Sequence, residues 1–121
     1  MARILIVDDS PTDTHVLKTM LERNGYVTIS VLDGEQGIST ATAERPDLIL
    51  MDVVLPGISG FQATRQITKN PDTAAIPVII VTTKNQETDR IWGLRQGAKD
   101  YITKPVDEAE LLAKIKSALG G

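Results

Sequence analysis

Short apolar runs, separated by longer segments of mixed polarity, recur five times along this chain. Three of them contain the uninterrupted stretches ILIV, LILM and VIIV, which are typical of parallel strands buried on both faces. A fourth, VTISV, alternates between apolar and polar residues, as expected of a strand at the edge of a sheet. The predicted strands are Arg3–Val7, Val27–Val31, Leu48–Met51, Val78–Val81 and Asp100–Ile102.

The segments between these runs carry the start signals and the apolar spacing of helices. Ser10, Pro11 and Asp13 provide a capping residue, a proline at the first helical position and an acidic third residue. The other helices are expected to begin near Asp33, Ser59, Gln86 and Asp107. The apolar stripes include Val16, Leu17, Met20 and Leu21 in the first helix, Phe61 and Ile67 in the third, Ile91 and Leu94 in the fourth, and Leu111, Leu112, Ile115, Ala118 and Leu119 in the fifth. This alternation predicts an α/β fold with right-handed crossovers and helices on both faces of a parallel sheet.

Composition narrows the class of protein. A length of 121 residues suits one domain with a hydrophobic core, so residues 1–121 are expected to form a single domain. The absence of cysteine excludes disulfides and thiolate metal sites. A net charge of −3 provides no basic surface for nucleic acid, and apolar runs of four or five residues are too short for membrane insertion. Because the N-terminus lacks the layout of a signal peptide, the expected location is cytoplasmic.

Charged residues follow three of the predicted strands. Asp8 and Asp9 come after the first, Asp52 after the third, and Lys104 with Pro105 after the fifth. Parallel strands bring their carboxyl ends to one edge of the sheet, where open α/β folds place their ligands. Three carboxylates meeting there repel one another unless a cation is present, and Mg²⁺ favours such oxygen ligands. A nearby lysine could then offset the charge of a bound phosphoryl group.

The motifs that contain these residues resemble the response-regulator receiver domain. The match consists of VDDS at residues 7–10, LMDVVLPGISG at 50–60, VIIVTT at 78–83 and DYITKPV at 100–106, and it covers essentially the whole chain. The resemblance implies a flavodoxin-like (CheY-like), doubly wound five-stranded parallel sheet of order 2-1-3-4-5 with five helices. It also implies a single receiver domain, residues 1–121, with no output domain.

The resemblance assigns roles at the expected site. Asp52 would be the phosphoacceptor, a carboxylate nucleophile that forms an acyl phosphate. Asp8, Asp9, Asp52 and the backbone carbonyl of Val54 would hold Mg²⁺. Lys104 would pair with a phosphoryl oxygen, and its peptide bond to Pro105 would be cis.

Other positions would convert phosphorylation into a change of surface. By the same resemblance, the Thr82 hydroxyl would bind the phosphoryl group and Tyr101 would change rotamer. The surface of the fourth helix, last strand and last helix would alter, with Trp92, Arg95 and Lys99 on the partner face. Alternatives remain at this point, because Tyr101 could be plain core packing and Trp92 simple surface cover. The positive cluster of Lys84, Arg90, Arg95 and Lys99 could equally dock to an acidic partner or form a solvated face. His15 is expected to be a surface residue.

The segments GFQATRQITKN and VTTKNQETDRIWGLRQGAKDYITKPVD narrow the resemblance. They are similar to stand-alone receivers of the chemotaxis-like system that controls type IV pili and twitching motility. The implied partner is a histidine kinase (CheA-like), with or without separate phosphotransfer domains, and the implied state is a monomer or weak dimer. Output would come from docking to another protein or from draining phosphoryl groups from the kinase as a phosphate sink. The chain would catalyse only its own phosphorylation and autodephosphorylation.

Two other functions compete with a signalling switch. A Mg²⁺-dependent phosphohydrolase can also use an aspartyl phosphate, but Val54 stands where such an enzyme would place a second acid. A nucleotide or flavin binder would need a glycine-rich loop after the first strand, and that loop reads DDSPTD. Neither alternative fits the residues as well as the switch does.

Overall fold

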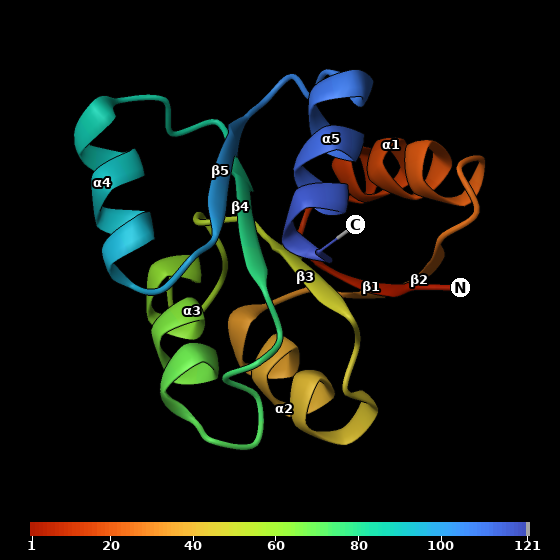
Figure 1. Cartoon of the computed structure of the whole chain (residues 1–121). Helices are drawn as coiled ribbons and strands as arrows, with labels where there is room; N and C mark the ends of the chain where they lie inside the picture. The colour runs from red at the N-terminus through yellow and green to blue at the C-terminus, as the bar shows by residue number, and fades with distance from the viewer. Residues whose placement is uncertain (121) are drawn as a thin grey trace.

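Five parallel strands alternate with five helices in the computed structural model, which describes residues 1–120 (Figure 1). The sheet order is β2-β1-β3-β4-β5, so the predicted order 2-1-3-4-5 is confirmed. β4 and β5 each run one residue further than predicted, because Thr82 pairs with Thr103 at the end of their ladder. The strands are β1 Arg3–Val7, β2 Val27–Val31, β3 Leu48–Met51, β4 Val78–Thr82 and β5 Asp100–Thr103.

Each predicted capping residue lies at the start of a helix. The Ser10 hydroxyl accepts a hydrogen bond from Asp13 N, and Asp33 and Asp107 accept the equivalent bonds in their own helices. At Ser59 the bond is reciprocal, since the Gln62 side chain also accepts from Ser59 N. The helices are α1 Pro11–Glu22, α2 Gly34–Glu44, α3 Gly60–Lys69, α4 Glu87–Arg95 and α5 Glu108–Ala118. Within residues 1–120, no helix is long and apolar enough to cross a membrane.

Helices cover both faces of the sheet, with α1 and α5 on one side and α2, α3 and α4 on the other (Figure 1). Successive residues of β1 therefore point into different cores. Ile4 and Ile6 pack with the apolar residues of α1 and α5, while Leu5 and Val7 pack with those of α2 and α3. Burial on both faces explains why the central strands are continuous apolar runs, whereas β2 lies at the edge and is partly exposed.

The predicted apolar face of α4 is wrong. Ile91 is 42% exposed, and the residues that α4 and its C-cap bury are Gly93 and Gln96. A Cβ on Gly93 would lie 2.7 Å from Cδ1 of Ile80 and 3.1 Å from the Tyr101 ring. The helix thus approaches the sheet through its smallest residue, and this close approach turns the bulky Ile91 side chain outward.

Val16 is a second exception to the predicted stripes. Its neighbours Leu17 and Leu21 are buried beneath α1, but Val16 remains 41% exposed. Val16 lines a small hollow beside Pro105 and Val106 instead of entering the core. The apolar stripe of α1 therefore widens at the end of the helix that lies nearest the carboxyl edge of the sheet.

Candidate functional site

Three aspartates meet at the carboxyl edge of the sheet, as the sequence predicts. Asp8 follows β1 and Asp52 follows β3, and these strands are neighbours, with Asp52 N donating to Val7 O at 3.0 Å. One carboxylate oxygen from each of Asp8, Asp9 and Asp52 lies within 4.8 Å of the others. The adjacent pairing of β1 and β3 is what brings residues more than 40 positions apart into one acidic cluster.

The three carboxylates differ in burial. Asp8 is 1% and Asp52 8% exposed, and each accepts a hydrogen bond from a nearby main-chain N–H. Ser10 N donates to Oδ1 of Asp8 at 2.9 Å, and Val53 N donates to Oδ1 of Asp52 at 2.6 Å. These bonds fix the orientation of both carboxylates. Asp9 is exposed and has no ion-pair partner among residues 1–120.

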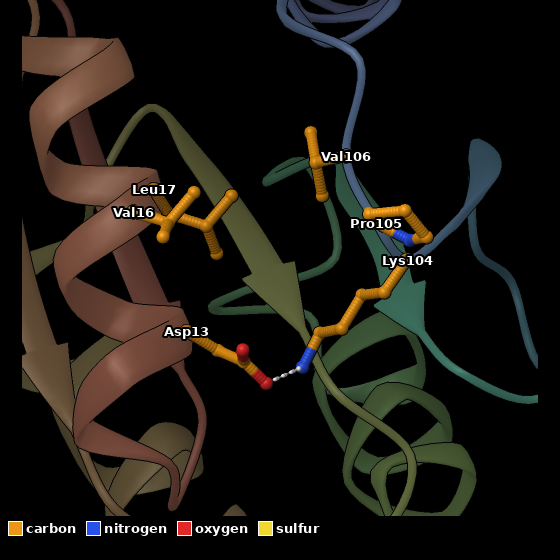
Figure 2. Close-up of a pocket in the computed structure, with 6 residues that line it drawn as sticks. All are labelled: Asp13, Val16, Leu17, Lys104, Pro105 and Val106. Carbon is orange, nitrogen blue, oxygen red and sulfur yellow. Dashed lines mark hydrogen bonds and ion pairs between the residues drawn. The ribbon is translucent and has the colours of Figure 1, made fainter.

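Lys104 crosses from the end of β5 to the acidic cluster. Its Nζ lies 2.8 Å from Oδ2 of Asp8 and 2.9 Å from Oδ2 of Asp52, and its side chain is only 10% exposed. A third ion pair joins Nζ to Oδ2 of Asp13 at 2.8 Å (Figure 2). Burial alone would lower the pKa of Lys104, but hydrogen bonds to Asp13, Asp8 and Asp52 outweigh it and raise that pKa. The lysine is therefore charged at neutral pH.

The same surroundings also shift the pKa of Asp8, but there the effect of burial is larger than that of the hydrogen bonds. Burial raises the pKa of Asp8 above its ordinary value, against the lowering effect of the hydrogen bonds from Lys104 and Ser10. Asp52 adds repulsion that acts in the same direction as burial. A second cation at this edge would relieve the repulsion between these two buried carboxylates.

Sequence reasoning missed Asp13, which it treated only as an acidic residue in the first turn of a helix. Its backbone N–H does bond to Ser10, but its carboxylate points across to Lys104 (Figure 2). The available signal was its spacing, because Asp13 comes four residues after Asp9 at the start of α1. Because α1 begins at Pro11, this position puts Asp13 in the first turn of the helix, close to the sheet edge where Asp8 and Asp9 lie.

Lys104 directly follows β5 and is held in place by the end of β4. Lys104 N donates to Thr82 O at 2.8 Å, and the Lys104–Pro105 peptide bond is cis, as the resemblance implied. Thr82 itself is fully buried at the end of β4, and Lys84 N donates to its hydroxyl oxygen at 3.4 Å. Thr82 and Lys104 therefore occupy neighbouring strand ends at the same edge as the aspartates.

Tyr101 lies inside the protein. It is 5% exposed and packs with Ile80, Val53 and Ala98 beneath α4. Its hydroxyl donates to Lys84 O at 2.8 Å, which ties the ring to the loop after Thr82. The ring is thus both a core residue and a direct link between β5 and the β4–α4 loop.

The tyrosine leads to a testable pH dependence. Burial, with smaller contributions from Asp89 and Asp52, raises the pKa of Tyr101 from 10.0 to about 12. A raised pKa in the folded state stabilises the protein fully below pH 10, and this contribution is lost as the pH rises toward 12. We expect Tyr101→Phe to unfold about 1 kcal/mol more easily at pH 7, because it lacks the bond to Lys84 O.

The extra stability of wild type over Tyr101→Phe should be lost at alkaline pH, because the variant has no hydroxyl at position 101 that can ionise. Urea unfolding of both proteins between pH 7 and pH 11 measures the effect, with Tyr26→Phe as the matched control for tyrosine loss at a half-buried position. A difference between wild type and Tyr101→Phe that stays constant over this range would contradict the assignment.

The residues predicted for the partner face lie on α4 and in the segment that follows it. Trp92 is 51% exposed and borders a hollow between α3 and α4, together with Phe61 and Arg65. Lys99 lines a second hollow, next to Asp100 and the last turns of α5. Arg95 is exposed on α4, and His15 is exposed on α1, so the prediction that His15 is a surface residue is confirmed.

Comparisons with known sequences and with solved structures agree on the family of this chain. The model of the response regulator receiver domain matches residues 4–116. Protein PilH of Pseudomonas aeruginosa is 60% identical over 121 residues, which is the full length of both chains. Two other curated relatives are longer. The chain is 39% identical to response regulator PleD of Caulobacter vibrioides, of which it spans 26%, and 38% identical to the phosphate regulon transcriptional regulatory protein PhoB of Escherichia coli, of which it spans 51%.

Solved structures share the fold along nearly the whole chain. A CheY-like receiver domain protein from Methanospirillum hungatei superposes with a TM-score of 0.90 and 32% identity, covering 99% of this chain and 94% of that one. The receiver domain of the sensor histidine kinase PA1611 from P. aeruginosa has a TM-score of 0.91 and 36% identity, with 99% and 98% covered. That receiver has magnesium coordinated in its active-site cleft. With a family match over residues 4–116, the receiver sheet order and an acidic cluster at its carboxyl edge, this chain belongs to the response regulator receiver domain family.

Proposed function

We propose that this chain is a signalling switch that accepts a phosphoryl group on Asp52 from a histidine kinase. The observation that carries the proposal is the contact of Lys104 with both Asp52 and Asp8, at an edge where Asp9 supplies a third carboxylate. A buried nucleophile, a cation beside it and additional acids form the set that phosphoryl transfer to a carboxylate requires.

In the proposed reaction, an oxygen of ionised Asp52 attacks the phosphorus of the donor in line with the leaving group. The new bond joins carboxylate oxygen to phosphorus, the bond from phosphorus to the donor breaks, and its electron pair leaves with the donor. Val53 N–H holds one oxygen of Asp52, which orients the carboxylate before attack. Lys104 then offsets the negative charge that the phosphoryl group brings into the site.

A divalent cation fits the donors at this edge. The oxygen-only set of Asp8, Asp9 and Asp52 suits Mg²⁺, and Asp9 is exposed without an ion-pair partner among the described residues. We propose these three carboxylates and the backbone carbonyl of Val54 as its ligands. When bound, Mg²⁺ would supply charge neutralisation and alignment for the phosphoryl group.

Mg²⁺ should therefore stabilise the folded protein, and Asp9→Asn should remove the effect. At a Mg²⁺ concentration ten times its dissociation constant, the free energy of unfolding should rise by about 1.4 kcal/mol in wild type. Without the metal, Asp9→Asn should unfold like wild type, because the Asp9 side chain is exposed. Urea unfolding with and without MgCl₂ measures both, and the exposed Asp72→Asn is the charge-matched control. Equal stabilisation of wild type and Asp9→Asn would place the metal elsewhere.

The response to phosphorylation is proposed to pass through Thr82 and Tyr101. Thr82 would donate its hydroxyl to the phosphoryl group, and the Tyr101 ring would change position with the loop that holds its hydroxyl. The bond from Tyr101 to Lys84 O supports this coupling, because Lys84 N also donates to the Thr82 hydroxyl oxygen. The outcome would be a changed surface around Trp92, Arg95 and Lys99, to which a protein partner binds.

We propose that the pathway controls type IV pili and twitching motility. We also propose that the protein acts in the cytoplasm. Identity of 60% to Protein PilH over the full length of both chains supports the proposed pathway. The protein's proposed phosphoryl donor is a CheA-like kinase, and its output is either docking to a target protein or removal of phosphoryl groups from that kinase. Membership of the receiver family favours the switch over the phosphohydrolase and the flavin or nucleotide binder, and we propose no turnover of other substrates.

Incubation with acetyl phosphate and Mg²⁺, followed by intact mass measurement, tests the proposal. We expect a gain of one phosphoryl group that requires Mg²⁺ and is lost in EDTA, with a coincident change in Trp92 fluorescence. A folded, Mg²⁺-binding protein that gains no mass from either acetyl phosphate or a histidine kinase would overturn it.

A further inference from the structure

We propose that Asp13 is a releasable partner that restrains Lys104, so that the phosphoryl group must take the place of Asp13 on the lysine. This inference rests on the proposed phosphorylation of Asp52, and it assigns to Asp13 the role of a positioning residue that slows phosphoryl acceptance. It follows from the contacts of Lys104, the burial of its three partners and the lining of the adjacent cavity.

The hydrogen-bonding capacity of Lys104 is already filled. An ammonium group has three N–H donors, and Nζ of Lys104 has three carboxylate partners, Asp8, Asp13 and Asp52, at 2.8, 2.8 and 2.9 Å. A phosphoryl oxygen on Asp52 therefore finds no free donor on the lysine. One of the three carboxylates has to give up its hydrogen bond before Lys104 can bind the new anion.

Asp13 is the carboxylate that can be released most easily. Its side chain is 41% exposed, against 2% for Asp8 and 10% for Asp52, so water replaces the lysine most readily at Asp13. Asp8 and Asp52 are in addition held by Ser10 N and Val53 N. Asp52 must also remain near Lys104, because it carries the phosphoryl group in the proposed reaction.

The surroundings of Asp13 provide no substitute for it. Asp13 and Lys104 line a cavity of about 160 Å³, and the remaining lining residues are the apolar or uncharged Val16, Leu17, Pro105 and Val106 (Figure 2). Within the described residues, Asp13 is the one acid that lines this cavity. Loss of the Asp13 charge therefore weakens the hold on one donor of Lys104, because a neutral acceptor binds an ammonium group less strongly than a carboxylate does. It also removes a negative charge from the surroundings that an anionic phosphoryl donor meets.

Three variants separate this role from a general effect of charge. Asp13→Asn keeps the shape and removes the charge, and Asp13→Glu restores a carboxylate on a longer side chain. Glu22→Gln makes the same change in net charge at the other end of α1, where Glu22 contacts Lys18 and Thr28 instead of the site. Urea unfolding verifies that all three variants are folded.

We expect Asp13→Asn to gain the phosphoryl group from acetyl phosphate about fivefold faster than wild type, the size expected when one half-exposed ion pair no longer competes. Beryllofluoride, a mimic of the phosphoryl group, should bind about fivefold more tightly in the presence of Mg²⁺, as measured by titration of amide NMR signals. Asp13→Glu should return both values toward wild type, and Glu22→Gln should leave both unchanged.

The outcomes distinguish this inference from the proposed function. If wild type gains no phosphoryl mass and binds no beryllofluoride, the function proposed for Asp52 fails and the inference fails with it. If wild type is phosphorylated but Asp13→Asn matches it or is slower, the inference alone is overturned. An equal increase in Asp13→Asn and Glu22→Gln would also overturn it, because the effect would then follow from net charge.

Discussion

Asp52→Asn is expected to lose phosphoryl gain from acetyl phosphate by at least about 100-fold, because an amide cannot act as the carboxylate nucleophile. The variant is nearly the same size as wild type, and its side-chain oxygen can still accept the bond from Val53 N. It also removes one of two buried negative charges that face each other beside Lys104. We therefore expect a folded protein with no phosphoryl acceptor, measured by intact mass over time.

The matched control is Asp72→Asn, which removes one charge from an exposed position outside the site. It should gain the phosphoryl group at the wild-type rate. Circular dichroism and urea unfolding exclude loss of the fold as the cause in Asp52→Asn. A phosphoryl gain by folded Asp52→Asn at a rate close to wild type would mean that another residue accepts the group.

Gly60→Ala is expected to lower the free energy of unfolding by about 3 kcal/mol or more, because the added methyl group meets main chain that cannot move aside. A Cβ at Gly60 would lie 1.8 Å from the carbonyl oxygen of Asp52 and 2.8 Å from Cα of Val53. The first residue of α3 thus packs directly on the main chain that carries the proposed phosphoacceptor, and Gly60 N donates to Val53 O at 2.9 Å. Urea unfolding measures the loss.

Gly25→Ala separates this steric effect from the usual cost of replacing a glycine. Gly25 has a φ of +88° and open space around it, so alanine there should cost only about 1 kcal/mol through backbone strain. If Gly60→Ala were no more destabilising than Gly25→Ala, the close contact between α3 and the Asp52 main chain would not exist in solution. If it folds, Gly60→Ala should also accept phosphoryl groups slowly, since Asp52 would be displaced.

The sequence pattern predicted the parts of the fold that depend on local chemistry and on burial from both sides. Continuous apolar runs such as ILIV indicate strands buried on both faces when, as here, they are only four or five residues long and rich in β-branched residues. Caps such as Ser10 and Asp107 were predicted because their bonds join residues three apart. The strand order came only from the resemblance to a known family, since residue pattern alone does not specify which parallel strands are neighbours.

The errors arose where tertiary contact overrides helical spacing. Apolar spacing placed Ile91 in the core, but Gly93 permits a close approach to Ile80 that rotates the helix. Glycine has no hydrophobic signal, so a pattern of apolar residues cannot identify it as the contact.

The sequence predicted the site residues that follow strands, but it did not predict the site residue that lies in a helix. Asp8, Asp9, Asp52 and Lys104 were expected together because strand ends converge at one edge. The position of the Asp13 carboxylate depends on the direction in which α1 leaves the sheet and on the reach of Lys104. Both are tertiary properties that the sequence does not show. The helix-capping pattern already explained an acid at position 13, so it gave no indication of a second role.

The most direct test of the central claim is to locate the phosphoryl group in the chain. Borohydride reduces an acyl phosphate on aspartate to homoserine, and mass spectrometry of peptides from the treated protein identifies the reduced residue. The account predicts homoserine at position 52 alone, in protein treated with acetyl phosphate and Mg²⁺, and none in protein treated without Mg²⁺. Reduction at Asp8, Asp9 or Asp13, or a stable phosphoryl group on His15 with Asp52 unmodified, would contradict it.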